Sequence, residues 1–246
     1  MADPSHDFSG RRVLVTGGTR GLGLTLAHSF ADAGAKVVVT GRQALTGYYD
    51  ADLSRFEYQQ LRLTDSDSIA EVAARIGHLD VLVNNASAHI PASVDPSEHQ
   101  FLAHATRLGL IGPFAFTSRL RFRLGQSTQR AGGSVVNAPG THQWFELAHG
   151  DQARGELAQL TERLGIDWAR GRVRVNTVSA LLVLPQQSGL RVQIDRNSGP
   201  LLTRTHAPRA GTMRDIRNAV LFLASEGAAG VTGQDLRVNA RHERGV

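Results

Sequence analysis

The chain has 246 residues, of which 41% are hydrophobic, and its formal net charge is +5. This length and apolar content predict one folded α/β domain with a full core and argue against disorder. Because the chain has no cysteines, disulfides and thiolate chemistry are excluded, and we expect no metal site. No window reaches the roughly 18 apolar residues of a membrane span, and residues 1–10 lack the pattern of a signal peptide. We therefore expect a cytoplasmic protein without a membrane partner.

Residues 13–23, VLVTGGTRGLG, pass from an apolar run into glycines and then into a helix over about 21–34. The run over 13–15 predicts a short buried strand, and glycines follow at 17, 21 and 23. Glycine lets a backbone turn sharply and approach a phosphate without a Cβ in the way. The free N–H groups at a helix N-terminus attract the same phosphate. The segment therefore predicts a nucleotide cradle, the alternative being an ordinary strand-to-helix turn.

Strand-like and helical patterns alternate along the rest of the chain. Such alternation predicts a mostly parallel sheet with helices on both faces and a ligand crevice at the carboxyl ends of the strands. We see no linker or repeat, so residues 1–246 are expected to form a single domain, in which the irregular stretch 181–211 is a lid or substrate loop. We expect further strands over 37–40, 59–63, 81–86, 134–137, 173–178 and 235–239, and helices over 66–76, 97–124, 152–169 and 212–225.

The positive charge comes almost entirely from arginine, and Arg121 and Arg123 lie together in the run RLRFRLGQ. Such a run suits nucleic acid or an acidic partner, but it also suits a solvated helix end or a subunit interface. We favour the second interpretation and do not expect nucleic acid as a partner.

The chain resembles the short-chain dehydrogenase/reductase family over nearly its whole length. The likeness rests on five motifs in the family's order: TGGTRGLG at 16–23, DVLVNNA at 80–86, GSVVN at 133–137, VRVNTV at 173–178 and VTGQDLRV at 231–238. The resemblance implies a Rossmann-type, doubly wound, mostly parallel seven-stranded sheet. It also implies a dinucleotide in the glycine cradle. Directly after the NNA motif at 84–86, where the family usually has a glycine, this chain has Ser87, which should narrow the space beside the ribose. The other implied contacts are Gly17, Thr19, Arg20, Gly21, Leu22, Gly23, Leu63, Asn85 and Ala86.

Charge at the end of the second expected strand predicts which dinucleotide binds. Arg42 stands where the ribose 2′ position should fall, and an acidic residue there would instead bind the free hydroxyl of NAD. Because guanidinium matches phosphate well, Arg42 favours the 2′-phosphate of NADP(H), and Arg20 can reach the same group. The alternative for Arg42 is an ordinary surface arginine. One departure from the family is Arg62, which stands where an aspartate commonly holds the adenine.

The residues that carry reduction in the family are absent from the matching positions. The family uses an asparagine, a serine, a tyrosine that donates the proton, and a lysine; these map to Gly109, Gly140, Gly150 and Arg154. All three tyrosines of the chain precede residue 60, so the loss of the tyrosine does not depend on the alignment. The three glycines open volume for a larger ligand, or they record relaxed constraint in a protein that no longer catalyses.

Candidates for replacement chemistry lie beside the vacated positions. Thr141 and His142 follow Gly140, and Glu146, His149 and Asp151 lie near Gly150. Histidine titrates near neutrality and can serve as acid or base. Arg154 is suited to hold a ribose or a substrate anion but not to transfer a proton. We prefer His149 with Asp151 as an acid–base pair, the alternative for each residue being a solvated loop position.

Three functions are compatible with the sequence. The first is a non-standard enzyme that binds NADP(H) and catalyses a step such as dehydration, cyclisation or isomerisation of a mid-sized organic substrate. The second is a catalytically silent subunit or a nucleotide-sensing partner of an active homologue. The third is an NADPH-dependent carbonyl reductase with substitute residues, against which the absent tyrosine argues. Helices 97–124 and 152–169 correspond to the family's usual dimer face, so we expect a homodimer or homotetramer, or a hetero-oligomer with an active homologue.

Overall fold

The computed structural model describes residues 6–86, 103–104, 106–138, 150–180, 183–184 and 211–238. Seven parallel strands form one sheet in the order β3-β2-β1-β4-β5-β6-β9. The order reverses beside β1, as in doubly wound nucleotide-binding sheets. The strands are β1 Arg12–Val15, β2 Lys36–Gly41, β3 Glu57–Gln60, β4 Val81–Asn84, β5 Gly133–Asn137, β6 Val173–Ala180 and β9 Asp235–Val238.

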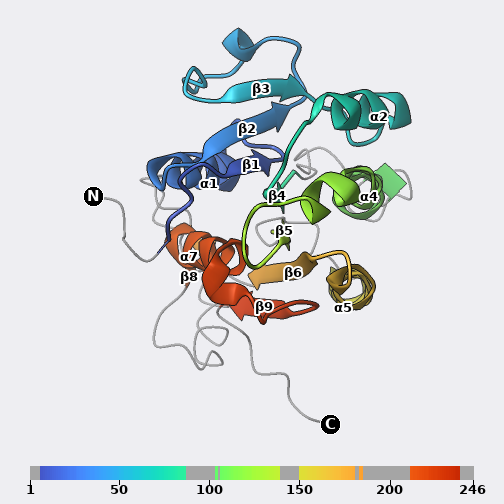
Figure 1. Cartoon of the computed structure of the whole chain (residues 1–246). Helices are drawn as coiled ribbons and strands as arrows, with labels where there is room; N and C mark the ends of the chain where they lie inside the picture. Colours follow the sequence, from blue (N-terminus) through green and yellow to red (C-terminus); the bar gives the residue numbers. More distant parts are fainter. Residues whose placement is uncertain are drawn as a thin grey trace.

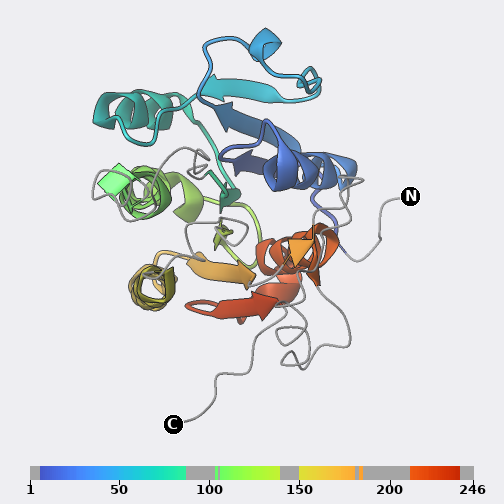
Figure 2. The same cartoon turned by 180° about the vertical axis from the view of Figure 1, so that it is seen from behind.

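Helices cover both faces of the sheet (Figures 1 and 2). Helices α1 (Gly21–Asp32) and α7 (Met213–Ala224) lie on one face. Helices α2 (Ser66–Arg75), α4 (Gly112–Gly125) and α5 (Gly150–Ala169) lie on the other. This arrangement confirms the Rossmann-type α/β fold expected from the sequence.

Successive residues of each strand face opposite layers, which divides the core in two. In β1, Val13 and Val15 pack with α1 and α7, whereas Leu14 packs with α2, α4 and α5. All three side chains are fully buried. Because both faces are covered, the central strands β1, β2 and β4 carry the continuous apolar runs VLV, VVV and VLV without polar alternation.

The third strand begins earlier than the sequence pattern predicted. The pattern QQLRL placed it at 59–63, but β3 spans Glu57–Gln60. Leu61 and Leu63 follow the last paired residue of β3 and are buried in the core beneath α2. The alternation of apolar and polar residues over 61–63 therefore reflects burial of a loop. The predicted bounds of the third strand, 59–63, were wrong.

The long helix expected over 97–124 is interrupted within its described part. A π-helical turn spans Arg107–Ile111, and α4 begins at Gly112. A Cβ at Gly112 would run into the carbonyl oxygen of Leu63. Glycine at this position therefore lets α4 begin directly against the segment that follows β3.

The two ends of the expected loop 181–211 are held together. Strand β7 (Val183–Leu184) pairs with β8 (Gly211–Thr212) in a separate two-stranded sheet. The sequence pattern did not predict this pairing. Residues 185–210 lie outside the described part of the chain, so their role as a lid or substrate loop stays a prediction.

A buried carboxylate anchors the amino ends of the central strands. Asp80 is fully buried and accepts hydrogen bonds from the backbone N–H of Arg12 at 2.9 Å and from Ser127 Oγ at 2.6 Å. His78 Nε2 lies 3.0 Å from the same carboxyl group. Asp80 thereby ties the start of β4 to β1 and to the segment that leads into β5.

We expect Asp80→Ala to lower the free energy of unfolding by about 3 kcal/mol, because it leaves buried donors without an acceptor. Urea unfolding followed by circular dichroism measures this loss. The matched control is Glu71→Ala, which removes an exposed carboxylate 4.0 Å from Arg75 and should change stability by less than about 0.5 kcal/mol. Equal effects of the two substitutions would contradict the anchoring role of Asp80.

Candidate functional site

A cleft of about 860 Å³ opens at the carboxyl ends of β1, β2, β3 and β4. Its size lies within the range of small-molecule and cofactor sites. Its walls come from the glycine loop after β1, the segments that follow β2 and β3, and the first residues after β4. The cleft therefore lies where the sequence analysis expected a ligand crevice.

The glycine loop is held against β4 by a side-chain amide. Asn85 Nδ2 donates to the carbonyl oxygens of Thr16 at 3.1 Å and Gly17 at 3.2 Å. A Cβ at Gly23 would run into the carbonyl oxygen of Gly17 and into Asn85 Nδ2. Gly17 also adopts a positive φ of 64°, which favours glycine. The loop thus depends on small residues at two positions.

Helix α1 begins directly at this loop, at Gly21. Arg20, at the N-cap position, makes no side-chain capping hydrogen bond. The first N–H groups of an α-helix have no partner within the helix. These free N–H groups of α1 face the cleft and are suited to bind a phosphate.

Three arginines line the same cleft, namely Arg20, Arg42 and Arg62. All three are exposed. Within the described ranges their guanidinium groups form neither an ion pair nor a side-chain hydrogen bond. Unpaired guanidinium groups around one cleft favour an anionic ligand, since arginine pairs readily with phosphate and carboxylate.

The sequence-predicted nucleotide contacts come together here. Ser87 lies outside the described residues. That the others contact a nucleotide stays a prediction, but their placement around one cleft is a finding. The residues that line the cleft are Gly17, Thr19, Arg20, Gly21, Leu22, Gly23, Arg42, Leu63, Asn85 and Ala86.

The aromatic part of the wall was not predicted from the sequence. Tyr48 and Tyr49 line the cleft beside Gln43. Tyr48 lies in a single 3₁₀ turn, Thr46–Tyr48, and is 69% exposed. The available signal was the adjacent pair Tyr48 and Tyr49 in the connection between β2 and β3, residues 42–56, over which the sequence pattern predicted no helix.

Comparison with known proteins fits this geometry. A family model described as enoyl-(acyl carrier protein) reductase matches residues 17–240. The chain belongs to the short-chain dehydrogenase/reductase family. Gluconate 5-dehydrogenase of Gluconobacter oxydans is 30% identical over 97% of this chain and 97% of its own length. The 3-oxoacyl-[acyl-carrier-protein] reductase FabG of Escherichia coli is 30% identical over 95% of this chain and 97% of its own.

A solved relative carries a cofactor. The crystal structure of a gluconate 5-dehydrogenase from Burkholderia cenocepacia, in complex with NADP and tartrate, is 27% identical to this chain. It superposes with a TM-score of 0.74 and covers 95% of each chain. A relative with this fold therefore binds NADP.

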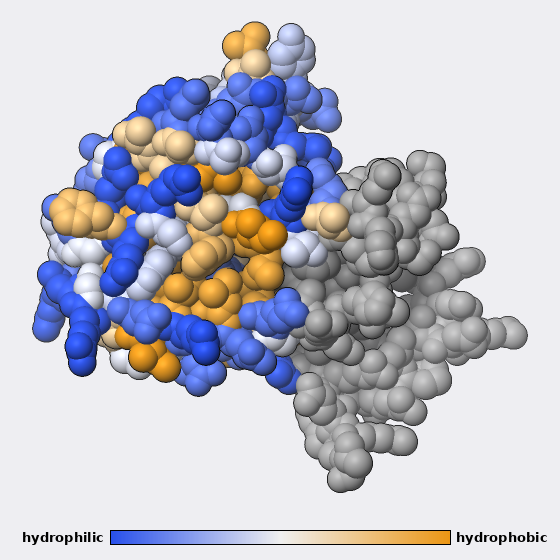
Figure 3. Space-filling model, turned by 90° about the vertical axis from the view of Figure 1, so that its right-hand side faces the viewer, coloured by the Kyte–Doolittle hydropathy of each residue, from blue (hydrophilic) through white to orange (hydrophobic). Residues whose placement is uncertain are grey.

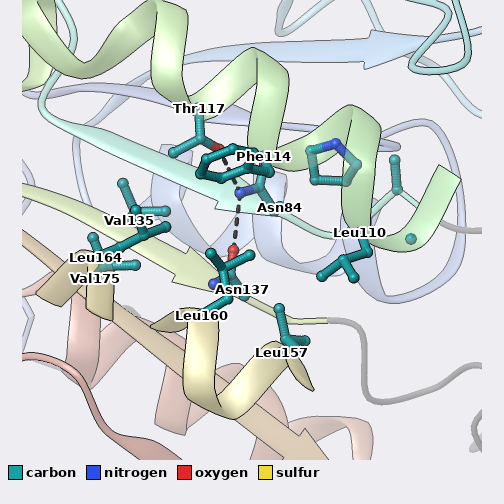
Figure 4. Close-up of a pocket in the computed structure, with 13 residues that line it drawn as sticks. Asn84, Leu110, Phe114, Thr117, Val135, Asn137, Leu157, Leu160, Leu164 and Val175 are labelled. Carbon is teal, nitrogen blue, oxygen red and sulfur yellow. Dashed lines mark hydrogen bonds between the residues drawn. The ribbon is translucent and has the colours of Figure 1, made fainter. Parts of the chain in front are cut away.

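Besides the cleft, this short-chain dehydrogenase/reductase has a smaller apolar hollow between α4 and α5. Apolar side chains gather around it on the face shown in Figure 3, within a border of polar residues. Its floor is polar: Asn84 Nδ2 donates to Thr117 Oγ1 and to Asn137 Oδ1, both at 2.9 Å (Figure 4). Asn84 Oδ1 is buried and has no partner within the described residues. Gly109 lines the rim of this hollow.

The positions expected to carry catalysis are only partly described. Gly109 lies in the π-helical turn. Gly150 is the first residue of α5, and Asp151 and Arg154 follow on the same helix, but their side chains are not described. Gly140, Thr141, His142 and His149 lie outside the described residues. The replacement of the family's four catalytic residues, and the roles of their neighbours, therefore stay predictions.

The basic run on α4 contacts the protein itself. The guanidinium carbon of Arg121 lies 5.3 Å from the ring centroid of Trp168. Arg123 Nη2 donates to the carbonyl oxygen of Ala74 at 3.4 Å. Both contacts join α4 to neighbouring helices, so these two charges have a structural use.

Among the described residues, no group of three or more histidines, aspartates or glutamates lies close enough together to hold a metal ion. None of the described helices combines the length and apolar character that a membrane crossing requires.

Tyr58, on β3 behind the aromatic wall, should make stability depend on alkaline pH. Burial and the hydrogen bond to Tyr49 raise its pKa above the ordinary value of 10.0. Since the folded-state pKa is raised, the contribution of the neutral phenol is complete below about pH 10 and is lost as the pH rises further. Urea unfolding at about pH 9 and about pH 11 should show a smaller loss in Tyr58→Phe than in the wild type. Equal losses would contradict the shift.

Proposed function

We propose that this protein binds NADP(H) in the cleft, with the pyrophosphate at the glycine loop and the 2′-phosphate at Arg42 and Arg20. The observation that carries the proposal is the presence of unpaired Arg20 and Arg42 on the same cleft as the glycine loop. The NADP complex of the gluconate 5-dehydrogenase relative supports the choice of cofactor.

The residues of the cleft fit this group. Gly23 leaves the space that a Cβ would fill, so the backbone at Gly17 remains open to a phosphate. The N-terminus of α1 offers N–H donors, and the arginines supply the charge that a 2′-phosphate needs. When bound, NADP(H) supplies hydride chemistry to enzymes that use it for redox.

We further propose that the protein does not use the tyrosine–lysine acid chemistry of its family. The sequence of α5 holds neither a tyrosine nor a lysine. Lys36, the one lysine of the chain, is the exposed first residue of β2, at the amino end of the strand and therefore opposite the cleft. The three tyrosines lie at 48, 49 and 58, beside the β2 end of the cleft.

The proposed activity is a non-standard step on a mid-sized organic substrate, with His149 and Asp151 as the preferred acid–base pair and Arg154, His142 and Thr141 beside them. The relatives whose names describe dehydrogenases and reductases support an oxidoreductase ancestry. They do not specify the reaction, because that depends on groups at the vacated positions.

The second candidate is a silent or nucleotide-sensing subunit. The face formed by α4 and α5 favours it, because Phe114, which lines the apolar hollow, is 40% exposed, and Ile111, at the end of the π-helical turn before α4, is 55% exposed. Phe122 and Ile166 are exposed on the same two helices. Exposed apolar patches of this kind mark interaction sites. We therefore propose an oligomer through α4 and α5, with a second copy or an active homologue, and we place the protein in the cytoplasm.

Gly23→Ala should weaken NADPH binding at least tenfold, because the new Cβ displaces the loop from Asn85. Fluorescence titration with NADPH measures the dissociation constant. Gly77→Ala is the matched control, since a Cβ there meets open space, and its affinity should equal that of the wild type. Failure of the wild type to bind NADPH at millimolar concentration would overturn the proposed cofactor.

The purified protein alone should not oxidise NADPH when it is offered a panel of ketones that includes keto acids of sugars and 3-oxoacyl thioesters. Absorbance of the reduced nicotinamide follows the reaction, and mass spectrometry follows products formed without nicotinamide turnover. A product of the second kind supports the non-standard enzyme. Activity that arises only on mixing with a homologue supports the silent subunit. Steady NADPH oxidation by the protein alone would contradict both.

A further inference from the structure

The three tyrosines of the chain gather at one end of the cleft. Tyr48 and Tyr49 line it, and Tyr58 lies on β3 with its ring centroid 6.0 Å from that of Tyr49. Tyr49 and Tyr58 are half-buried, whereas Tyr48 is exposed. The two half-buried rings therefore form a fixed pair, in which Tyr49 lines the cleft and Tyr58 packs behind it.

A closed circuit of hydrogen bonds joins this pair to the backbone. The N–H of Gln43 donates to Tyr49 Oη at 2.9 Å. The two hydroxyl oxygens lie 3.2 Å apart, and Tyr58 Oη donates to the carbonyl oxygen of Gln43 at 2.5 Å. Because the Tyr58 hydroxyl gives its one proton to Gln43, the Tyr49 hydroxyl donates to Tyr58. The hydrogen bonds then run in one direction, from the N–H of Gln43 through Tyr49 and Tyr58 to the carbonyl oxygen of Gln43.

The circuit requires both phenols to be protonated. Burial and the contact with Tyr49 raise the pKa of Tyr58, so its hydroxyl keeps the proton that it donates to Gln43. Both backbone groups of Gln43 are thus satisfied by side chains from the β2–β3 connection and from β3.

Neighbouring contacts fix the rest of the segment that carries Arg42. Gln60 Nε2 donates to the carbonyl oxygen of Arg42 at 2.9 Å. The backbone N–H of Leu61 donates to the carbonyl oxygen of Gly41 at 2.8 Å. A Cβ at Gly41 would run into the hydroxyl of Tyr49 and the methyl group of Thr19. The backbone at 41–43 is therefore held from three directions, while the Arg42 guanidinium is left without a partner among the described residues.

We infer that Tyr49 and Tyr58 are positioning residues that hold the Arg42 backbone in place and so determine the preference for NADPH over NADH. The inference rests on the proposed binding of NADP(H). An arginine on a fixed backbone loses less conformational freedom when it pairs with phosphate. Removing one hydroxyl opens the circuit and leaves a backbone group of Gln43 without its partner.

Dissociation constants for NADPH and NADH test this inference on the full chain, without any need for a substrate. Tyr58→Phe should weaken NADPH binding about fivefold to tenfold, as expected for the loss of one hydrogen bond, and should leave NADH binding within about twofold. Tyr49→Phe should act in the same direction and provides a second route if the first variant folds poorly. NADH is the internal control, because it has no 2′-phosphate to sense Arg42.

A double-mutant cycle with Arg42→Ala separates positioning from general damage. In the Arg42→Ala background, Tyr58→Phe should cause no further loss of NADPH affinity. Equal losses for NADPH and NADH, or an undiminished effect in that background, would overturn the inference. The inference would also be overturned if both tyrosine variants kept the NADPH affinity of the wild type while Arg42→Ala lowered it. In that case the proposed binding of NADP(H) would still stand. A wild type with no preference for NADPH would overturn the proposed 2′-phosphate contact together with the inference.

Discussion

The contact between Asn85 and the backbone of the glycine loop is the interaction on which the cleft depends. It joins the segment after β4 to the carbonyl oxygens of Thr16 and Gly17, so the two central strands present one continuous edge. Thr16 Oγ1 strengthens the junction, because it accepts hydrogen bonds from the N–H groups of Asn85 and Ala86, both at 3.0 Å. The start of α1, and with it the helix end that faces the ligand, is fixed by the same junction.

Much of this architecture follows from local sequence patterns. The apolar runs and the glycines at 17, 21 and 23 predict the fold and the cradle, because buried parallel strands and tight turns constrain residue type strongly. The end of β3 was missed because Leu61 and Leu63 are buried without being in a strand. The tyrosine circuit was missed because it depends on the pairing of β2 with β3, which brings Gln43 and Tyr58 together across 15 residues.

Binding and chemistry are separated along this chain. The cofactor side is built from residues that follow β1, β2, β3 and β4, all within the first 86 residues apart from His104 and Leu108. The expected catalytic side depends on positions around 140 and 150, where glycine and arginine are predicted to remove the groups that the family uses. Sequence alone predicts that removal but not its replacement, because a new acid–base pair is defined by geometry and not by a motif.

The composition of the cleft has a consequence for chemical modification in the cell. Its positive charge is carried by guanidinium groups, which acyl donors do not neutralise as they neutralise lysine amines. The chain's one lysine side chain, Lys36, stands at the amino end of β2. Lysine acetylation therefore has no target at the cleft. The positive charge of the cleft cannot be reduced by this modification, which responds to metabolic state.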